Sequence, residues 1–107
     1  MSEKPTIQVL EQSKQQSKYN WMNINYGGTR IGKLRSLIVG RTLTIYSINI
    51  FPEFERHGYA RKVIKTFQTR FDIIIADRVR CTAKEFWEKM DFIDKKDGTY
   101  IWKSRRE

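Results

Sequence analysis

The chain has 107 residues, of which 39% are hydrophobic, and a formal net charge of +9. This length fits one domain with a modest core, so we expect a single domain over residues 1–107. No apolar run approaches the length of a membrane span, residues 1–5 do not resemble a signal peptide, and the only cysteine, Cys81, cannot form an internal disulfide. These features predict a cytoplasmic protein with no membrane partner.

The first forty residues have the pattern of short strands separated by turns. Gly27-Gly28 and Gly40-Arg41 are turn signals between stretches of strand composition. The polar, Gln-rich residues 13–18 are expected to form a loop or a weak helical turn. The expected strands cover residues 6–10, 19–26 and 29–39.

Residues 42–52 carry no charged side chain. An edge strand of an antiparallel sheet would show polar residues on one face, so this run is expected at the centre of the sheet, covered on both faces. Residues 58–71 have apolar side chains at helical spacing and predict an amphipathic helix. The run Ile73-Ile74-Ile75-Ala76 predicts a buried strand within residues 72–79. Strand, helix and strand in this order predict a βαβ unit with a parallel pair.

A second helix is expected from Thr82, because Thr82 and Glu85 have the spacing of a capping box. The sequence Lys96-Asp97-Gly98 then predicts the turn of a terminal hairpin. The predicted fold class is α+β: a mixed central sheet, antiparallel at its ends, with a parallel βαβ pair in the middle and two main helices. The expected core residues are Ile48, Ile50, Val63, Ile64, Phe67, Ile74, Phe86 and Met90.

The loop between the uncharged strand and the first helix is the segment best suited to bind a phosphate. Free backbone N–H groups at a helix start can hold an anion, and Gly58 lets a ligand approach the backbone closely. Basic side chains surround this point, whereas Glu55 opposes an anion there unless it points away or pairs with an arginine. The basic side chains are Arg56, His57, Arg61 and Lys62.

Two segments resemble motifs of the GNAT superfamily of N-acetyltransferases. Glu55-Arg56-His57-Gly58-Tyr59-Ala60 is similar to the family pattern Arg/Gln-x-x-Gly-x-Gly/Ala, with Glu55 in place of the leading Arg or Gln. Residues 83–92, Ala-Lys-Glu-Phe-Trp-Glu-Lys-Met-Asp-Phe, resemble the family's late helix, Ala-x-x-Phe-Tyr-x-Lys-x-Gly-Phe. Here Trp87 replaces a Tyr that often protonates the departing thiolate, and Asp91 replaces the Gly that ends the helix.

The resemblance implies a GNAT-like fold, acetyl-CoA as acyl donor and an amine as acceptor. It implies that the backbone of Ile48 and Ile50 binds the pantetheine arm, and that Arg80 occupies a position where the family often has Asn. The residues implied around the cofactor pyrophosphate are Arg56, His57, Gly58, Tyr59, Ala60 and Arg61.

The attacking amine must lose a proton, yet the uncharged strand has no carboxylate to accept it. Glu53 and Glu55 lie just beyond this strand, and either could be the base, with Glu53 the first candidate. Tyr46 is a candidate acid, and Trp87 is a candidate donor to the thiolate. One Cys and one His cannot assemble a zinc site, so no metal is expected.

Three functions fit these observations, and the leading one is an acetyl-CoA-dependent N-acetyltransferase. The second is a catalytically silent module of the same fold. The third is a small basic nucleic-acid-binding protein, with stacking surfaces at Trp21, Tyr26, Tyr46 and Trp102. Family members usually have two helices between their first two strands, where this chain has only residues 11–18. The resemblance therefore implies an acceptor site that is either open to a protein substrate or completed by a second subunit in a homodimer.

Overall fold

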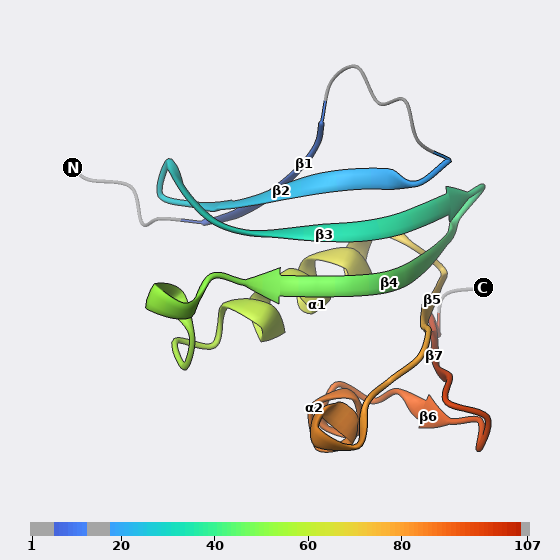
Figure 1. The fold of residues 1–107 in the computed structure, drawn as a ribbon. Coiled ribbons are helices and arrows are strands. Elements are labelled where there is room, and N and C mark those ends of the chain that lie inside the picture. Colours follow the sequence, from blue (N-terminus) through green and yellow to red (C-terminus); the bar gives the residue numbers. More distant parts are fainter. Residues whose placement is uncertain (1–5, 13–17, 106–107) are drawn as a thin grey trace.

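The structure, a computed structural model, describes residues 6–12 and 18–105. Seven strands form one sheet in the order β1-β2-β3-β4-β5-β7-β6 (Figure 1). The strands are β1 (Ile7–Glu11), β2 (Asn20–Tyr26), β3 (Thr29–Val39), β4 (Thr42–Ile50), β5 (Ile73–Ala76), β6 (Ile93–Asp94) and β7 (Tyr100–Lys103). The helices are α1 (Tyr59–Arg70) and α2 (Lys84–Lys89), with 3₁₀ turns η1 (Pro52–Phe54) and η2 (Cys81–Ala83).

Strand pairing confirms the predicted α+β class. Neighbouring strands are antiparallel except for β4 and β5, which pair in parallel from Thr42 opposite Ile73 to Ile45 opposite Ala76. The parallel pair is joined by α1, because a parallel connection must return the chain to the same end of the sheet. Strand β4 is the middle strand of the seven, as its uncharged sequence predicts.

Both helices pack on the same face of the sheet. Helix α1 contributes Val63, Ile64 and Phe67, each at most 1% exposed, and α2 contributes Trp87. In Figure 1, β4 crosses in front of α1, so the view shows the opposite, uncovered face of the sheet. No helix in residues 6–12 and 18–105 is long and apolar enough to cross a membrane.

The turns confirm the hairpins expected from glycine. Gly27 and Gly28 have φ of 60° and 85°, and Gly98 has φ of 88°, all in the left-handed region that glycine enters without steric cost. The residues between β1 and β2 that were expected to form a loop or helical turn, 13–17, lie outside the described residues.

The expectation that β4 is covered on both faces is wrong. Leu43 and Ile45 are buried beneath the helices, but Ser47 and Asn49 are exposed on the other face. The side chains of Ser47 and Asn49 are uncharged but polar, and water solvates them on this face. A strand without charged residues therefore need not be buried on both faces. This open face becomes one side of the candidate site.

The predicted capping box is also wrong. Thr82 lies inside the η2 turn, so the N-cap of α2 is Ala83, and no side chain caps that helix. Of the expected core residues, Val63, Ile64, Phe67, Ile74 and Met90 are buried. Ile48, Ile50 and Phe86 are only half-buried and pack against the core from the walls of surface cavities.

Candidate active site

A groove opens where β4 and β5 separate. Their last contact is a hydrogen bond of 3.0 Å from the backbone N–H of Asp77 to the carbonyl of Ile45. Two residues later the N–H of Val79 donates to the carbonyl of Gly98 at 2.8 Å, which draws the chain toward the β6–β7 turn. At the far end of β4 the N–H of Phe51 donates to Ile31 in β3, so β4 stays with β3. The two strands therefore separate as a wedge.

A β-bulge at Tyr46 marks the apex of this wedge. The register between β3 and β4 passes from Ser36 opposite Ile45 to Arg35 opposite Ser47, which leaves Tyr46 without a partner in β3. A bulge twists the strand locally and re-aims its side chains. Tyr46 therefore sits one residue beyond the last β4–β5 pair, where the sheet opens.

The groove has a volume of about 390 Å³ and is walled by β4 on one side and by residues 76–80 on the other. Ala83 and Trp87 lie along it from the α2 side. Trp87 is 5% exposed and packs edge-on against Phe86 and Phe92, with ring centroids 5.1 and 4.9 Å away. These contacts fix the indole as a rigid wall.

The free edge of β4 offers backbone groups to a ligand in this groove. Successive residues of a strand turn their N–H and C=O groups to opposite edges. Since Phe51 bonds toward β3, the alternation turns Ile50 and Ile48 toward the groove. Ile48 lines the groove, and Ile50 lines the next cavity along the strand. An extended ligand could pair with β4 here as a strand would.

The second cavity, of about 320 Å³, lies at the start of α1. Gly58 is the N-cap of this helix, and no side chain caps it. The first helical bond runs from the N–H of Lys62 to the carbonyl of Gly58, so the amides that precede Lys62 in the first turn have no intrahelical acceptor. The residues lining this cavity are Ile50, Phe54, Glu55, Arg56, Gly58, Tyr59, Ala60, Arg61 and Phe86.

The backbone at Gly58 is open to a ligand. Its φ is 77°, and a Cβ added there would meet nothing within 4 Å. The preceding Arg56 also has a positive φ, 66°, which shows how sharply the loop turns before the helix. The helix start combines uncapped N–H groups, basic side chains and the positive end of the helix dipole, a combination suited to phosphate.

Tyr59 and His57 have a structural contact besides any role in binding. The Tyr59 ring lies 4.7 Å from the Tyr26 ring, and the His57 ring lies 5.5 Å from the Tyr59 ring. The ammonium group of Lys62 lies over the other member of the stack, Tyr26, 5.1 Å from its centroid. This column fixes the start of α1 against β2 and so positions the amides of the second cavity.

The structure brings together most of the residues predicted for the site. Ile48, Arg80, Tyr46 and Trp87 line the groove, and five of the six residues predicted around the pyrophosphate line the second cavity. His57 is exposed beside that cavity without lining it. Glu53 is exposed in η1 and lines neither cavity, so the structure does not bring the predicted base to the groove.

Asp77 is a carboxylate in the groove that sequence reasoning missed. It is half-buried, lines the groove and lies 3.9 Å from the Nε of Arg78. The available signal was its position as the first polar residue after the buried run 73–76. Ligands in open α/β sheets bind beyond the carboxyl ends of parallel strands, and Asp77 follows such an end.

Tyr100, in β7, is the other titratable group not expected from sequence. Its side chain is 1% exposed, and its hydroxyl donates to Glu88 Oε1 at 3.3 Å. Burial raises the pKa of Tyr100, and the charges of Asp94 and Glu88 raise it further. Asp94 stays ionised, because a hydrogen bond from the backbone N–H of Lys96 lowers its pKa.

We expect Tyr100 to make the protein less stable in alkali. A raised pKa means that the folded state holds the phenol proton more tightly than the unfolded chain. The resulting contribution of Tyr100 to the free energy of unfolding is fully present below pH ~10, the pKa of an unfolded tyrosine. It is lost as the pH rises through the pKa of Tyr100 in the folded protein. Urea unfolding between pH 8 and 11 should therefore show a steeper loss of stability in the wild type than in Tyr100→Phe. If stability falls equally with pH in the wild type and in Tyr100→Phe, the raised pKa of Tyr100 is contradicted.

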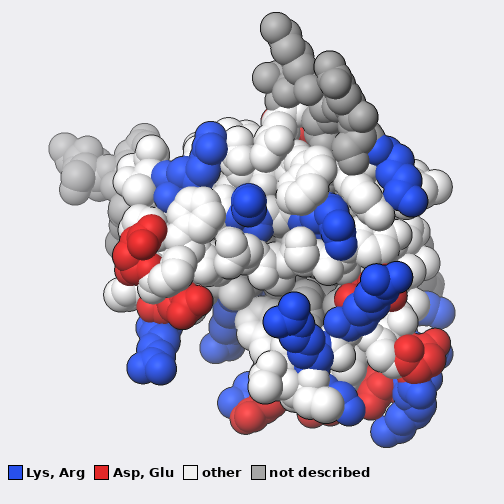
Figure 2. Space-filling model, in the orientation of Figure 1, with Lys and Arg blue, Asp and Glu red and all other residues white. Residues whose placement is uncertain are grey.

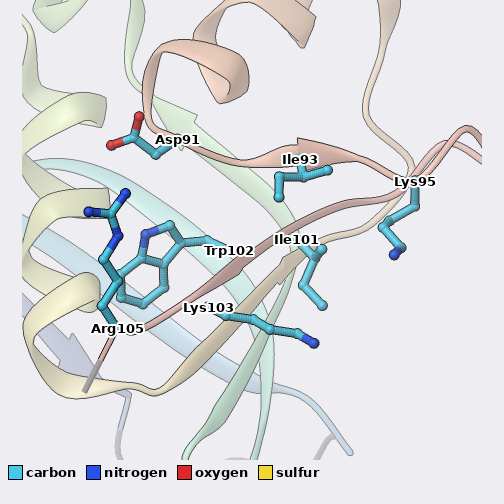
Figure 3. A pocket seen from close by; sticks show the side chains of 7 residues that line it. All are labelled: Asp91, Ile93, Lys95, Ile101, Trp102, Lys103 and Arg105. Atoms are coloured by element: carbon cyan, nitrogen blue, oxygen red, sulfur yellow. The ribbon is translucent and has the colours of Figure 1, made fainter. Parts of the chain in front are cut away.

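A larger cavity lies elsewhere in the fold. It measures about 610 Å³ and is formed at the β6–β7 edge of the sheet, with Ile101 and Trp102 half-buried in its wall (Figure 3). It contains no residue predicted for the site. Within the described ranges no three His, Cys, Asp or Glu residues are grouped so that they could hold a metal.

Comparison with solved structures identifies the architecture. An Escherichia coli protein described as the putative N-acetyl transferase YhhK bound to coenzyme A has a TM-score of 0.71 and 12% identity, covering 95% of this chain and 100% of its own. An acetyltransferase from Thermus thermophilus has a TM-score of 0.67 and 17% identity, with 82% and 66% coverage. The Bacillus subtilis N-acetyltransferase YlbP in complex with coenzyme A has a TM-score of 0.60 and 20% identity, with 78% and 66% coverage.

The chain thus has the GNAT fold, as the two sequence motifs predict. It spans 66% of the length of the Thermus and Bacillus proteins. No protein-family model matches the sequence, and no curated protein matches it.

Proposed function

We propose that this chain is a cytoplasmic N-acetyltransferase that uses acetyl-CoA as its acyl donor. One observation carries the proposal: the groove along β4, lined as far as Asn49, is followed along the same strand by the cavity that Ile50 lines at the uncapped start of α1. The groove suits an extended amide-bearing chain, and the helix start suits phosphates. Two of the solved structures with this fold are described with coenzyme A, which supports the same ligand here.

In this proposal the thioester lies in the groove near Tyr46, where the sheet opens. The amine nitrogen attacks the thioester carbonyl, a C–N bond forms, and the C–S bond breaks to release the thiolate. The attacking nitrogen loses its proton to Asp77 or to solvent. The phenol of Tyr46 supplies a proton to the thiolate, because Trp87 has only a weakly acidic indole N–H and serves as a wall.

The acceptor reaches this point from the uncovered face of the sheet. No helix within residues 6–12 and 18–105 lies over that face, which supports an amine on a protein as the acceptor. A nucleic-acid interface is less well supported. Tyr26 is occupied by Tyr59, Trp102 packs against the core, and Figure 2 shows Lys and Arg side chains scattered over the face rather than gathered in one patch.

The experiment measures stabilisation by acetyl-CoA and acetyl transfer to a pool of lysine peptides and polyamines over a pH series. We expect Asp77→Asn to lower turnover about 100-fold or more while retaining CoA affinity, because a positioned base typically contributes at least that much. Glu53→Gln is the paired variant and should leave turnover unchanged. The reverse pattern would restore Glu53 as the base. CoA binding without transfer to any amine would identify a silent module.

A further inference from the structure

The positively charged side chain of Arg35 lies beside the groove. Arg35 lies in β3 on the uncovered face, opposite Ser47 of β4, and Ser47 lines the groove. Among the ion pairs formed within residues 6–12 and 18–105, none includes Arg35. Its Nε atom is buried and has no hydrogen-bond partner in that part of the chain.

Two aromatic rings hold this guanidinium in place. Its central carbon lies 4.8 Å from the Tyr19 ring centroid and 5.7 Å from the Tyr46 ring centroid. The two rings also contact each other edge-on, with centroids 5.2 Å apart. Because both rings restrict the rotamers of Arg35, its side chain loses little conformational entropy when it binds a ligand.

Tyr46 joins this cluster to the reaction site. The same side chain contacts Arg35 and lines the groove, and it stands at the bulge where β4 and β5 separate. Aromatic rings attract a guanidinium but do not cancel its charge, and an arginine does not deprotonate in a protein. The Arg35 guanidinium, which forms no ion pair with residues 6–12 and 18–105, is therefore presented beside Tyr46, where the proposed function places the acceptor.

We propose that Arg35, fixed between Tyr19 and Tyr46, binds a carboxylate of the acceptor, so that the substrate is an amine that also carries a carboxylate. This inference rests on the proposed acetyl transfer. The planar guanidinium matches a carboxylate with two parallel hydrogen bonds, which fixes orientation as well as position. The carboxylate can come from a free amino acid or from an acidic residue beside the amine of a peptide.

The test compares matched acceptors that differ only in the carboxylate. One arm uses L-alanine against L-alaninamide, and the other uses the peptide amide Ala-Asp-Ala against Ala-Asn-Ala. We expect the enzyme to prefer the carboxylate-bearing acceptor in one of the two arms. That arm shows whether the carboxylate comes from a free amino acid or from an acidic residue of a peptide. Arg35→Gln should raise KM for the preferred acceptor about tenfold or more, with kcat retained, and leave KM for its uncharged counterpart unchanged. Arg35→Lys should recover part of the loss.

The matched control is Arg30→Gln, which removes the same charge from an exposed position in the same strand. It should leave both KM values unchanged, so a general loss of positive charge is separated from a specific contact. Acceptor binding is also followed by NMR shifts of the protein with and without CoA, which needs no turnover. If neither carboxylate binds better than its uncharged counterpart, or if Arg35→Gln and Arg30→Gln behave alike, the inference is overturned. Failure of CoA itself to bind would instead overturn the proposed function.

Discussion

Gly58→Glu will remove the stabilisation that CoA gives to the folded protein. The glutamate side chain would enter the open space above the start of α1 and place a carboxylate where the proposal puts the pyrophosphate. The wild type should gain about 2.7 kcal/mol of unfolding free energy at a CoA concentration 100 times its Kd, whereas the variant should gain almost nothing. Chemical denaturation with and without CoA measures both values.

A second left-handed glycine supplies the control for this variant. Gly40 has φ of 60°, against 77° for Gly58, and a Cβ added there also meets nothing within 4 Å. Gly40→Glu therefore adds the same charge and similar backbone strain, about 1–2 kcal/mol, in the turn between β3 and β4. Stabilisation by CoA should survive in Gly40→Glu. If it also survives in Gly58→Glu, the phosphates do not bind at the start of α1.

Phe67→Ala should destabilise the protein by about 3–5 kcal/mol, the cost of truncating a large aromatic side chain in a core. Phe67 is 1% exposed and lies on the buried stripe of α1 beside Ile64. This loss is a large part of the total stability of a small domain, which is commonly about 5–15 kcal/mol. Urea unfolding at neutral pH measures the difference.

The aromatic ring at the C-cap of α1 provides the comparison. Phe71 is half-buried, and its ring centroid lies 6.0 Å from that of Phe67. Phe71→Ala should therefore cost clearly less than Phe67→Ala, because part of its surface is already in water. If both substitutions lower the free energy of unfolding equally, burial of the ring does not determine how much it stabilises the protein.

Local sequence patterns predicted the elements well because each pattern has a single physical cause. The apolar spacing around Val63 and Phe67 predicted α1, and the run 73–76 predicted a buried strand. The Gly27-Gly28 pair predicted a turn that requires positive φ. The GNAT motif placed the uncapped helix start correctly, because the Gly58-x-Ala60 spacing and the helix are contiguous in sequence.

The chemistry of the groove could not be predicted in the same way, because it depends on where two strands separate. That position is set by the bulge at Tyr46, which arises from the register between β3 and β4 rather than from either sequence alone. Sequence reasoning considered Glu53, which follows the strand in the chain, and did not consider Asp77, which lines the groove. The cluster joins Tyr19, just before β2, with Arg35 in β3 and Tyr46 in β4, and it has no local sequence signature.

The wedge between β4 and β5 also divides the sheet mechanically. Strands β1–β4 form one leaf and β5, β7 and β6 another, and only the four residue pairs from Thr42–Ile73 to Ile45–Ala76 join the leaves by strand pairing. Opening along this seam breaks fewer backbone hydrogen bonds than opening β3 from β4, which pair over eight residues. Movement of one leaf against the other is therefore expected to be easier than separation of β3 from β4. A ligand that occupied the wedge as an added strand would bridge the two leaves. Amide hydrogen exchange in β5 and β7 should then slow, although these strands lie beyond the ligand's own contacts with β4.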